Sequence, residues 1–120
     1  MLHLSPAVRY YLFTSPADMR KGFDSLCGII LSQMQLDALS GSIFIFINKK
    51  RNQVKLLLWE GDGFSLYYKR LEQGTYERPD CSDANTSAVL SYQQLQFILQ
   101  GVTLRKIHYR KRYQKHSVSY

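Results

Sequence analysis

Positively charged side chains gather at a few places along this sequence, and some stand beside tyrosines. Lys49, Lys50 and Arg51 are adjacent, in the middle of an otherwise apolar stretch. Ammonium and guanidinium groups pair with phosphates, and aromatic rings stack on bases, so such a pattern is typical of nucleic-acid contact. The other candidate phosphate-binding residues are Lys55, Lys69, Arg70, Arg105, Lys106, Arg110, Lys111, Arg112 and Lys115.

The net charge of +7 is concentrated at the end of the chain. No acidic residue follows Asp83, whereas six cations lie between residues 105 and 115 and are interleaved with tyrosines. Such a block indicates attraction to a polyanion. The alternative is a solvated surface with a solubilising tail. We favour nucleic acid because the cations are both concentrated and mixed with aromatic residues.

Enzyme chemistry has few candidates. Hydrolysis or phosphoryl transfer needs clustered carboxylates, or a nucleophile beside a base. Asp18 is better explained as a helix cap, and Asp62, between two glycines, as a turn residue. We therefore predict no catalytic residue and no cofactor. A cryptic nuclease built from Asp24, Glu60 and Asp62 stays open as a third interpretation.

The usual metal ligands are scattered. His3, His108 and His116 form no pair with a ligand spacing, and Cys27 and Cys81 stand far apart. We predict no metal site, and we interpret the two cysteines as reduced thiols of a cytoplasmic protein. No apolar run approaches the roughly 20 residues of a membrane span, and the first residues lack the features of a secretory signal.

The positions of the cations between residues 49 and 70 depend on a predicted sheet. Residues 42–48 (SIFIFIN) are apolar on both parities, which predicts a central strand covered on both faces. Residues 54–60 and 64–71 predict two more strands. Because short loops with glycine join them, we expect an antiparallel meander with Lys49, Lys50 and Arg51 at a hairpin tip.

Two helices are predicted to pack with this sheet. The first begins at Ser15, with Asp18 completing a capping box, and reaches about residue 35 along an apolar stripe. The second is short, begins after the cap Ser91 and stops at Gly101.

Three further strands are predicted from shorter patterns, at residues 9–14, 75–78 and 88–90. Residues 79–87 are polar and turn-rich, which indicates an exposed loop. The chain is therefore expected to be one α+β domain over residues 1–104, with a mostly antiparallel sheet, followed by a weakly ordered basic tail over residues 105–120.

Two long motifs stand in order along the chain. The first is SPADMRKGFDSL (15–26), and the second runs from Phe44 to Gly74 through NKKR (48–51), VKLL (54–57), WEGDGF (59–64) and YKRLE (68–72). They resemble the signatures of a known bacterial family, the small accessory protein TnpB from the second reading frame of insertion-sequence-sixty-six transposable elements, which is distinct from the RNA-guided nuclease of the same name. The resemblance covers roughly residues 1–104, with mild departures such as Glu60 for the usual Asp.

The resemblance implies a role in transposition beside a separate, larger DDE-type transposase. From it and from the charge pattern we expect a non-enzymatic accessory factor that binds DNA and helps to assemble the transposition complex. The alternative is a module that docks on the transposase without direct DNA contact. Trp59 is predicted to be a buried structural residue, whose truncation to alanine costs roughly 3–5 kcal/mol.

Overall fold

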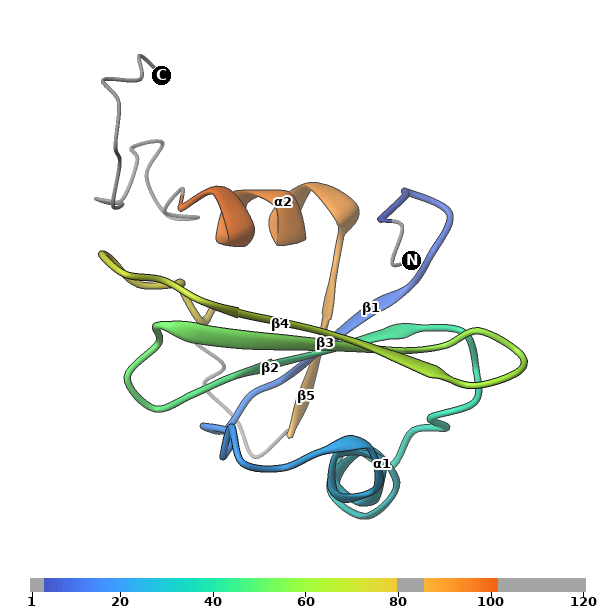
Figure 1. Ribbon diagram of the computed structural model, residues 1–120. Helices are drawn as coiled ribbons and strands as arrows, with labels where there is room; N and C mark the ends of the chain where they lie inside the picture. The colour runs from blue at the N-terminus through green and yellow to red at the C-terminus, as the bar shows by residue number, and fades with distance from the viewer. Residues whose placement is uncertain (1–3, 80–85, 102–120) are drawn as a thin grey trace.

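The computed structural model of the protein describes residues 4–79 and 86–101, which form an α+β fold (Figure 1). The predicted fold class is confirmed. The elements in chain order are β1 (Tyr10–Phe13), α1 (Phe23–Ser32), β2 (Ile43–Ile47), β3 (Gln53–Trp59), β4 (Phe64–Arg70), β5 (Ser87–Leu90) and α2 (Tyr92–Gln100).

The five strands form one mixed sheet in the order β4-β3-β2-β1-β5. The meander β2-β3-β4 is antiparallel, as predicted, and β5 pairs antiparallel with β1. Only the β1–β2 pair is parallel among the described strands. The central position of β2 is also confirmed, because all five of its residues are buried. In Figure 1, α2 lies on one side of the sheet and α1 on the other.

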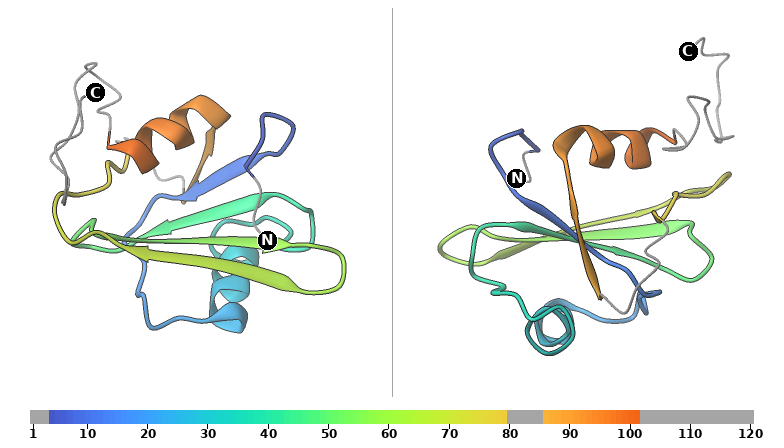
Figure 2. Two further views of the ribbon diagram at one scale, coloured as in Figure 1. Left: turned by 45° about the horizontal axis from the view of Figure 1, so that its top comes forward. Right: turned by 180° about the vertical axis from the view of Figure 1, so that it is seen from behind.

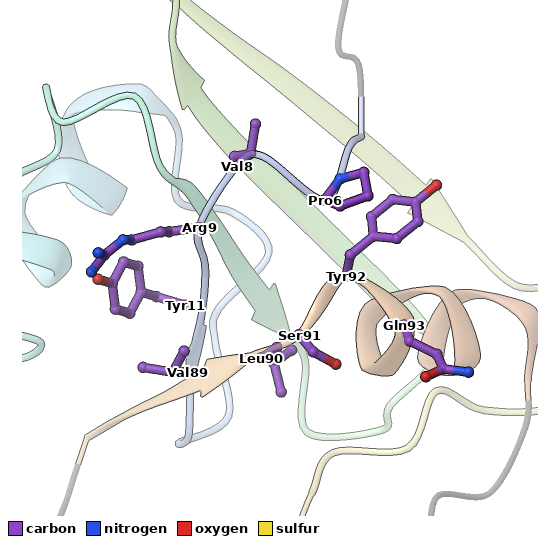
Figure 3. A pocket seen from close by; sticks show the side chains of 9 residues that line it. All are labelled: Pro6, Val8, Arg9, Tyr11, Val89, Leu90, Ser91, Tyr92 and Gln93. Carbon is purple, nitrogen blue, oxygen red and sulfur yellow. The ribbon is translucent and has the colours of Figure 1, made fainter.

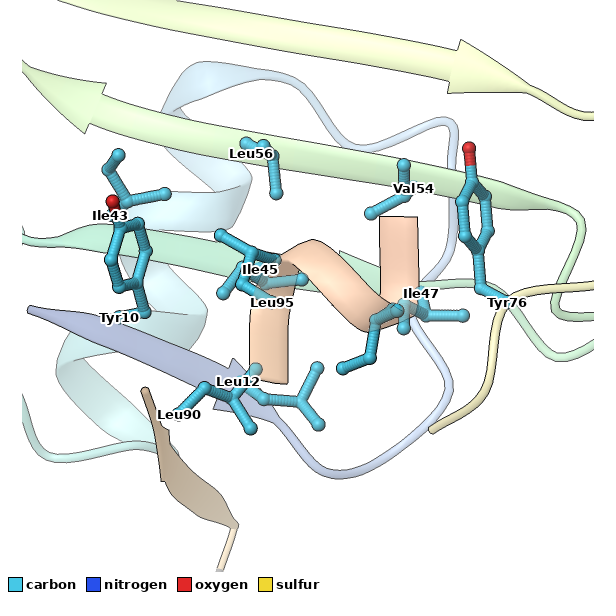
Figure 4. Close-up of a cluster of buried hydrophobic side chains, with 11 residues drawn as sticks. Tyr10, Leu12, Ile43, Ile45, Ile47, Val54, Leu56, Tyr76, Leu90 and Leu95 are labelled. Atoms are coloured by element: carbon cyan, nitrogen blue, oxygen red, sulfur yellow. The ribbon is translucent and has the colours of Figure 1, made fainter. Parts of the chain in front are cut away.

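The three isoleucines of β2 point to the face that α2 covers. There they meet Leu95 and Ile98 of the helix, both fully buried. Figure 4 shows this cluster, with the ring of Tyr76 at its edge beside Val54 and Ile47. The two phenylalanines of β2 belong to the opposite cluster, which contains Leu26 and Ile30 of α1. The strand is thus apolar on both parities because each face has its own helix.

The first helix is shorter than predicted. It begins at Phe23 rather than beside Ser15, and it ends at Ser32. The backbone N–H of Ala17 donates instead to the carbonyl oxygen of Ile47, at 2.9 Å. A bond to β2 at this position holds the chain in an extended path, so helical hydrogen bonding starts only after it has turned away from the sheet.

The predicted capping role of Asp18 is wrong. Its carboxylate accepts hydrogen bonds from the backbone N–H of Arg20 at 2.9 Å and from the Arg20 guanidinium, with Nη2 at 2.8 Å. This side-chain hydrogen bond is the main cause that lowers the pKa of Asp18 to about 2. A local turn that satisfies an aspartate in this way competes with a helix start.

The second helix forms as predicted. The hydroxyl of Ser91 accepts from the N–H of Gln94 at 3.0 Å, and the Gln94 side chain accepts from the Ser91 N–H at 2.8 Å. Gly101 ends the helix in the left-handed region, with φ of 87°. No helix in residues 4–79 and 86–101 is long and apolar enough to cross a membrane.

The predicted strand at residues 75–78 is absent, although the short edge strand at 88–90 exists as β5. Tyr76 is fully buried in the cluster under α2, and its N–H donates to the carbonyl oxygen of Arg51 at 2.6 Å. The segment is therefore held across the end of a hairpin by one buried ring and is not added to the sheet edge.

Trp59 is less buried than predicted. It lies at the end of β3, half-buried, with its ring edge-on to that of Phe64 at a centroid distance of 4.9 Å. Because less area leaves water, truncating Trp59 removes less stabilisation than the roughly 3–5 kcal/mol expected of a fully buried aromatic residue.

Gly28 gives a first prediction about stability. It lies in the interior of α1 on the exposed side, and a Cβ added there would meet no atom within 4 Å. We expect Gly28→Ala to raise the free energy of unfolding by about 1 kcal/mol, because alanine loses less backbone entropy in a helix. Urea denaturation measures this change.

A matched control is Gly41→Ala. A Cβ at Gly41 also meets nothing within 4 Å, but the φ of this residue is +83°. Alanine is strained in that region, so we expect a loss of about 1 kcal/mol. Equal effects of the two substitutions would contradict this account.

Candidate nucleic-acid interface

The hairpin tip (Lys49, Lys50 and Arg51) joins β2 to β3 and is exposed. It is shaped by Asn48, which is 9% exposed. The side-chain oxygen of Asn48 accepts from the N–H groups of Asn52 at 3.0 Å and Gln53 at 2.9 Å. The carbonyl oxygen of Asn48 accepts from the N–H of Arg51 at 3.0 Å. One buried asparagine therefore organises the turn that presents the three cations.

The chain after β4 also holds the hairpin tip. The N–H of Leu71 donates to the carbonyl oxygen of Asn52 at 2.7 Å, and Tyr76 donates to Arg51 as described above. Arg51 itself has a positive φ of 61°, a conformation that few non-glycine residues adopt. Bonds from two sides stabilise this conformation, so the cations stand on a fixed support.

Lys69 and Arg70 lie at the same end of the sheet. They face Val54 and Gln53 of β3, which follow directly after the hairpin tip. Both are exposed, but neighbouring residues of a strand point to opposite faces, so they do not form one patch. Arg70 also forms an exposed ion pair with Glu72, at 3.1 Å.

The end of α2, where Gly101 is the last described residue, belongs to the same part of the molecule. The three views in Figures 1 and 2 agree that the C-terminal end of α2, the hairpin tip and the C-terminal end of β4 lie on the same side of the molecule. We call this side the basic end of the sheet. The chain continues from Gly101 toward the six cations of the predicted tail.

Lys55 must be withdrawn from the predicted phosphate contacts. It is 5% exposed, and its Nζ donates to the carbonyl oxygens of Met19 at 2.8 Å and Lys21 at 2.7 Å. The ammonium also lies over the ring of Tyr68, 4.6 Å from its centroid. Burial and two carbonyl partners make Lys55 a structural residue.

Arg78 is a cation that the sequence analysis missed at this end. Burial lowers the pKa of its guanidinium, and the nearby positive charge of Arg51 lowers it further. The sequence held no signal for this, because Arg78 fell inside a predicted strand and reaches Arg51 only through the fold.

The carboxylates of the nuclease interpretation are not brought together. Asp24 lies in the first turn of α1, whereas Glu60 and Asp62 belong to the β3–β4 turn, where Glu60 accepts from the hydroxyl of Ser65 at 2.7 Å. Within the described residues, no group of three His, Cys, Asp or Glu side chains is placed to hold a metal ion.

Comparison with known proteins identifies the family. Residues 8–109 match the family model described as IS66 Orf2 like protein. The chain belongs to this family. The resemblance found in its motifs is thereby confirmed, and the family gives the protein an accessory role in an insertion sequence.

Two curated relatives of this IS66 Orf2-like protein come from Sinorhizobium fredii. It is 30% identical over 105 residues to the uncharacterized protein y4hO, covering 88% of this chain and 90% of the relative. It is 26% identical over 107 residues to the uncharacterized protein y4jC, covering 89% and 90%. No solved structure matches the chain.

The two motifs of the IS66 Orf2-like protein meet in space. Lys55 belongs to the second motif, and the carbonyls that it binds, those of Met19 and Lys21, belong to the first. Lys55 therefore joins β3 to two residues that lie 36 and 34 positions earlier in the chain. This contact adds to the bonds of Ala17 and Asp18 that hold the non-helical part of the first motif, ahead of α1.

A groove of about 570 Å³ lies away from the basic end, between β1, β5 and the start of α2 (Figure 3). The side chains of Arg9, directly before β1, and of Tyr11 in β1 extend to the same side as that of Val89. The lining includes no carboxylate, histidine or cysteine, so it offers no pair of acid and base groups. Its residues are Pro6, Val8, Arg9, Tyr11, Val89, Leu90, Ser91, Tyr92 and Gln93.

The tail cations predicted to bind phosphate lie outside the described residues, so their contribution stays a prediction. They are Arg105, Lys106, Arg110, Lys111, Arg112 and Lys115.

Proposed function

We propose that this protein is a non-enzymatic accessory factor of transposition that binds DNA and helps to assemble the transposition complex. The observation that carries the proposal is the basic end of the sheet. Exposed cations of the hairpin tip and of β4 lie on the side where the chain leaves α2 for its basic tail.

The cations of the hairpin tip are suited to phosphates. Among the described residues, no carboxylate pairs with Lys49, Lys50 or Arg51. Hydrogen bonds from Asn48 and from the chain after β4 hold the backbone that carries them, and a preformed backbone lowers the entropy cost of binding. Phosphate contacts of this kind bind the DNA backbone and release its counterions, without reading the base sequence.

Salt dependence tests the proposal. If about 4–7 phosphates are engaged, a plot of the logarithm of the binding constant against the logarithm of salt concentration has a slope of about −4 to −6. Fluorescence anisotropy with a labelled duplex from the element's end, and with a scrambled duplex, measures this slope. A slope near zero would exclude phosphate binding as the source of affinity.

The contribution of the tail is tested in the same assay. A variant with its six cations changed to glutamine keeps the chain length and is expected to have a flatter slope by about 2 to 4. Its melting temperature is expected to match that of the wild type. An unchanged slope would assign the contact to the described domain alone.

A second candidate function is docking on the transposase. The observation that favours it is β4, whose outer edge pairs with no strand of the described part of the chain. Tyr67 and Tyr68 are 40% and 52% exposed on this strand. An exposed strand edge with aromatic side chains is suited to adding a strand from another protein.

A further inference from the structure

Arg78 has an unusual environment for a charged side chain. Its Nη1 is shielded from solvent and has no hydrogen-bond partner among the described residues. No ion pair within that part of the chain neutralises it, and the like charge of Arg51 acts on it. Removing water from a cation without supplying an acceptor is unfavourable, and a second cation nearby adds to this cost.

The fold keeps Arg78 in this position. Tyr76, two residues earlier, is fully buried, and its N–H is bonded to the carbonyl oxygen of Arg51. The two arginines are thus tied together through the backbone. Arg78 is still partly exposed, so a ligand can approach it from the solvent side.

We infer that Arg78 and Arg51 form a binding site for a phosphate group at the basic end of the sheet. The identification of that group as a phosphodiester of DNA rests on the proposed function. Bound there, a phosphate supplies the negative charge that both guanidinium groups lack. It also converts a repulsive pair of cations into two attractive contacts.

Phosphate suits this pair better than a carboxylate does. A guanidinium presents parallel donors that match two phosphate oxygens, and a tetrahedral phosphate has further oxygens for a second arginine. Lys49 and Lys50 stand next to Arg51 and add positive potential without a fixed geometry.

The test uses the full chain and compares Arg78→Gln with Arg9→Gln. Both substitutions remove one positive charge, but Arg9 is exposed and precedes β1, whose start pairs with the start of β2 and so lies opposite the hairpin tip. Thermal unfolding is measured in chloride and in inorganic phosphate at equal ionic strength. Duplex binding is measured in chloride.

We expect phosphate to raise the melting temperature of the wild type and of Arg9→Gln, but not of Arg78→Gln. In chloride, Arg78→Gln is expected to melt at or above the wild-type temperature, because it removes an uncompensated charge. Its affinity for duplex DNA is expected to fall about tenfold, against about twofold for Arg9→Gln.

The other possible outcomes would contradict the inference in whole or in part. Lower stability of Arg78→Gln in chloride means that Arg78 already has a partner within the protein, which overturns the site. An unchanged phosphate effect in Arg78→Gln overturns it too. Loss of the phosphate effect with unchanged DNA affinity supports a site for free phosphate and overturns its use for DNA. In each of these cases, a steep dependence of wild-type DNA binding on salt concentration would still support the proposed function.

Discussion

Changing Lys49, Lys50 and Arg51 together to glutamate is expected to weaken DNA binding about 100-fold at moderate salt. The melting temperature is expected to change little or to rise, because the substitution at Arg51 removes the like charge that acts on Arg78. The substitution replaces three exposed cations by three anions on a support that is set by Asn48 and the backbone. Exposed substitutions of this kind usually change stability by less than about 0.5 kcal/mol. Anisotropy titration and thermal unfolding give the two quantities.

A matched pair of single variants distinguishes the effect of a cation's position on DNA affinity from the effect of net charge. Lys50→Glu and Arg9→Glu both change the charge by two at exposed positions, one on the hairpin tip and one far from it. We expect a clearly larger loss of affinity for Lys50→Glu. Equal losses would mean that only the overall charge matters.

The triple variant also distinguishes the two candidate functions. If it binds DNA as tightly as the wild type, the hairpin tip is a solvated surface and the contact lies elsewhere. If it binds DNA normally but no longer recruits the transposase, docking is the function of this end.

Lys55→Ala is expected to destabilise the fold by about 3 kcal/mol and to lower the melting temperature by about 10–20 °C. The substitution removes the donor to the carbonyls of Met19 and Lys21, and the position is almost closed to water. Carbonyl groups without a donor in such a place lose their hydration without compensation. Thermal and urea unfolding measure the loss.

Two controls make this prediction specific. Lys55→Met keeps the apolar stem and removes only the ammonium, so most of the loss is expected to remain. Lys69→Ala truncates an exposed lysine on the neighbouring strand and is expected to change stability by less than about 0.5 kcal/mol. If Lys55→Ala is as stable as Lys69→Ala, the buried contact does not hold the first motif in place.

The sheet could be predicted because its signals are local. Two opposite apolar faces in residues 43–47 identified the central strand, and glycine loops identified the meander. The start of α1 could not be predicted in the same way. Ser15-Pro16-Ala17-Asp18 has the composition of a helix start, but Ala17 donates to Ile47 instead. The carbonyls of the next residues, Met19 and Lys21, accept from Lys55, and both Ile47 and Lys55 are distant in sequence.

The candidate site likewise has parts with a local sequence signal and parts that depend on distant residues. The hairpin tip was located correctly because its position depends on two neighbouring strands. Lys55 was predicted to contact phosphate, yet it shares a parity with Leu57, which is fully buried. That parity was the one available signal. Arg78 has no such signal, since its environment arises from a segment that crosses the hairpin.

The position of β1 has a consequence for how the chain folds as it is made. Tyr10 pairs with Leu90, 80 positions later, whereas β2, β3 and β4 are joined by short loops. Hairpins with short loops form within about 1–10 μs, but the edge of β1 that faces away from β2 has to wait for β5. At about 5–20 residues per second of synthesis, that delay lasts several seconds. During this time the edge of β1 is open in addition to that of β4, and β1 carries side chains that are buried in the folded protein, so the ribosome-bound chain can mispair at a strand that the finished fold protects.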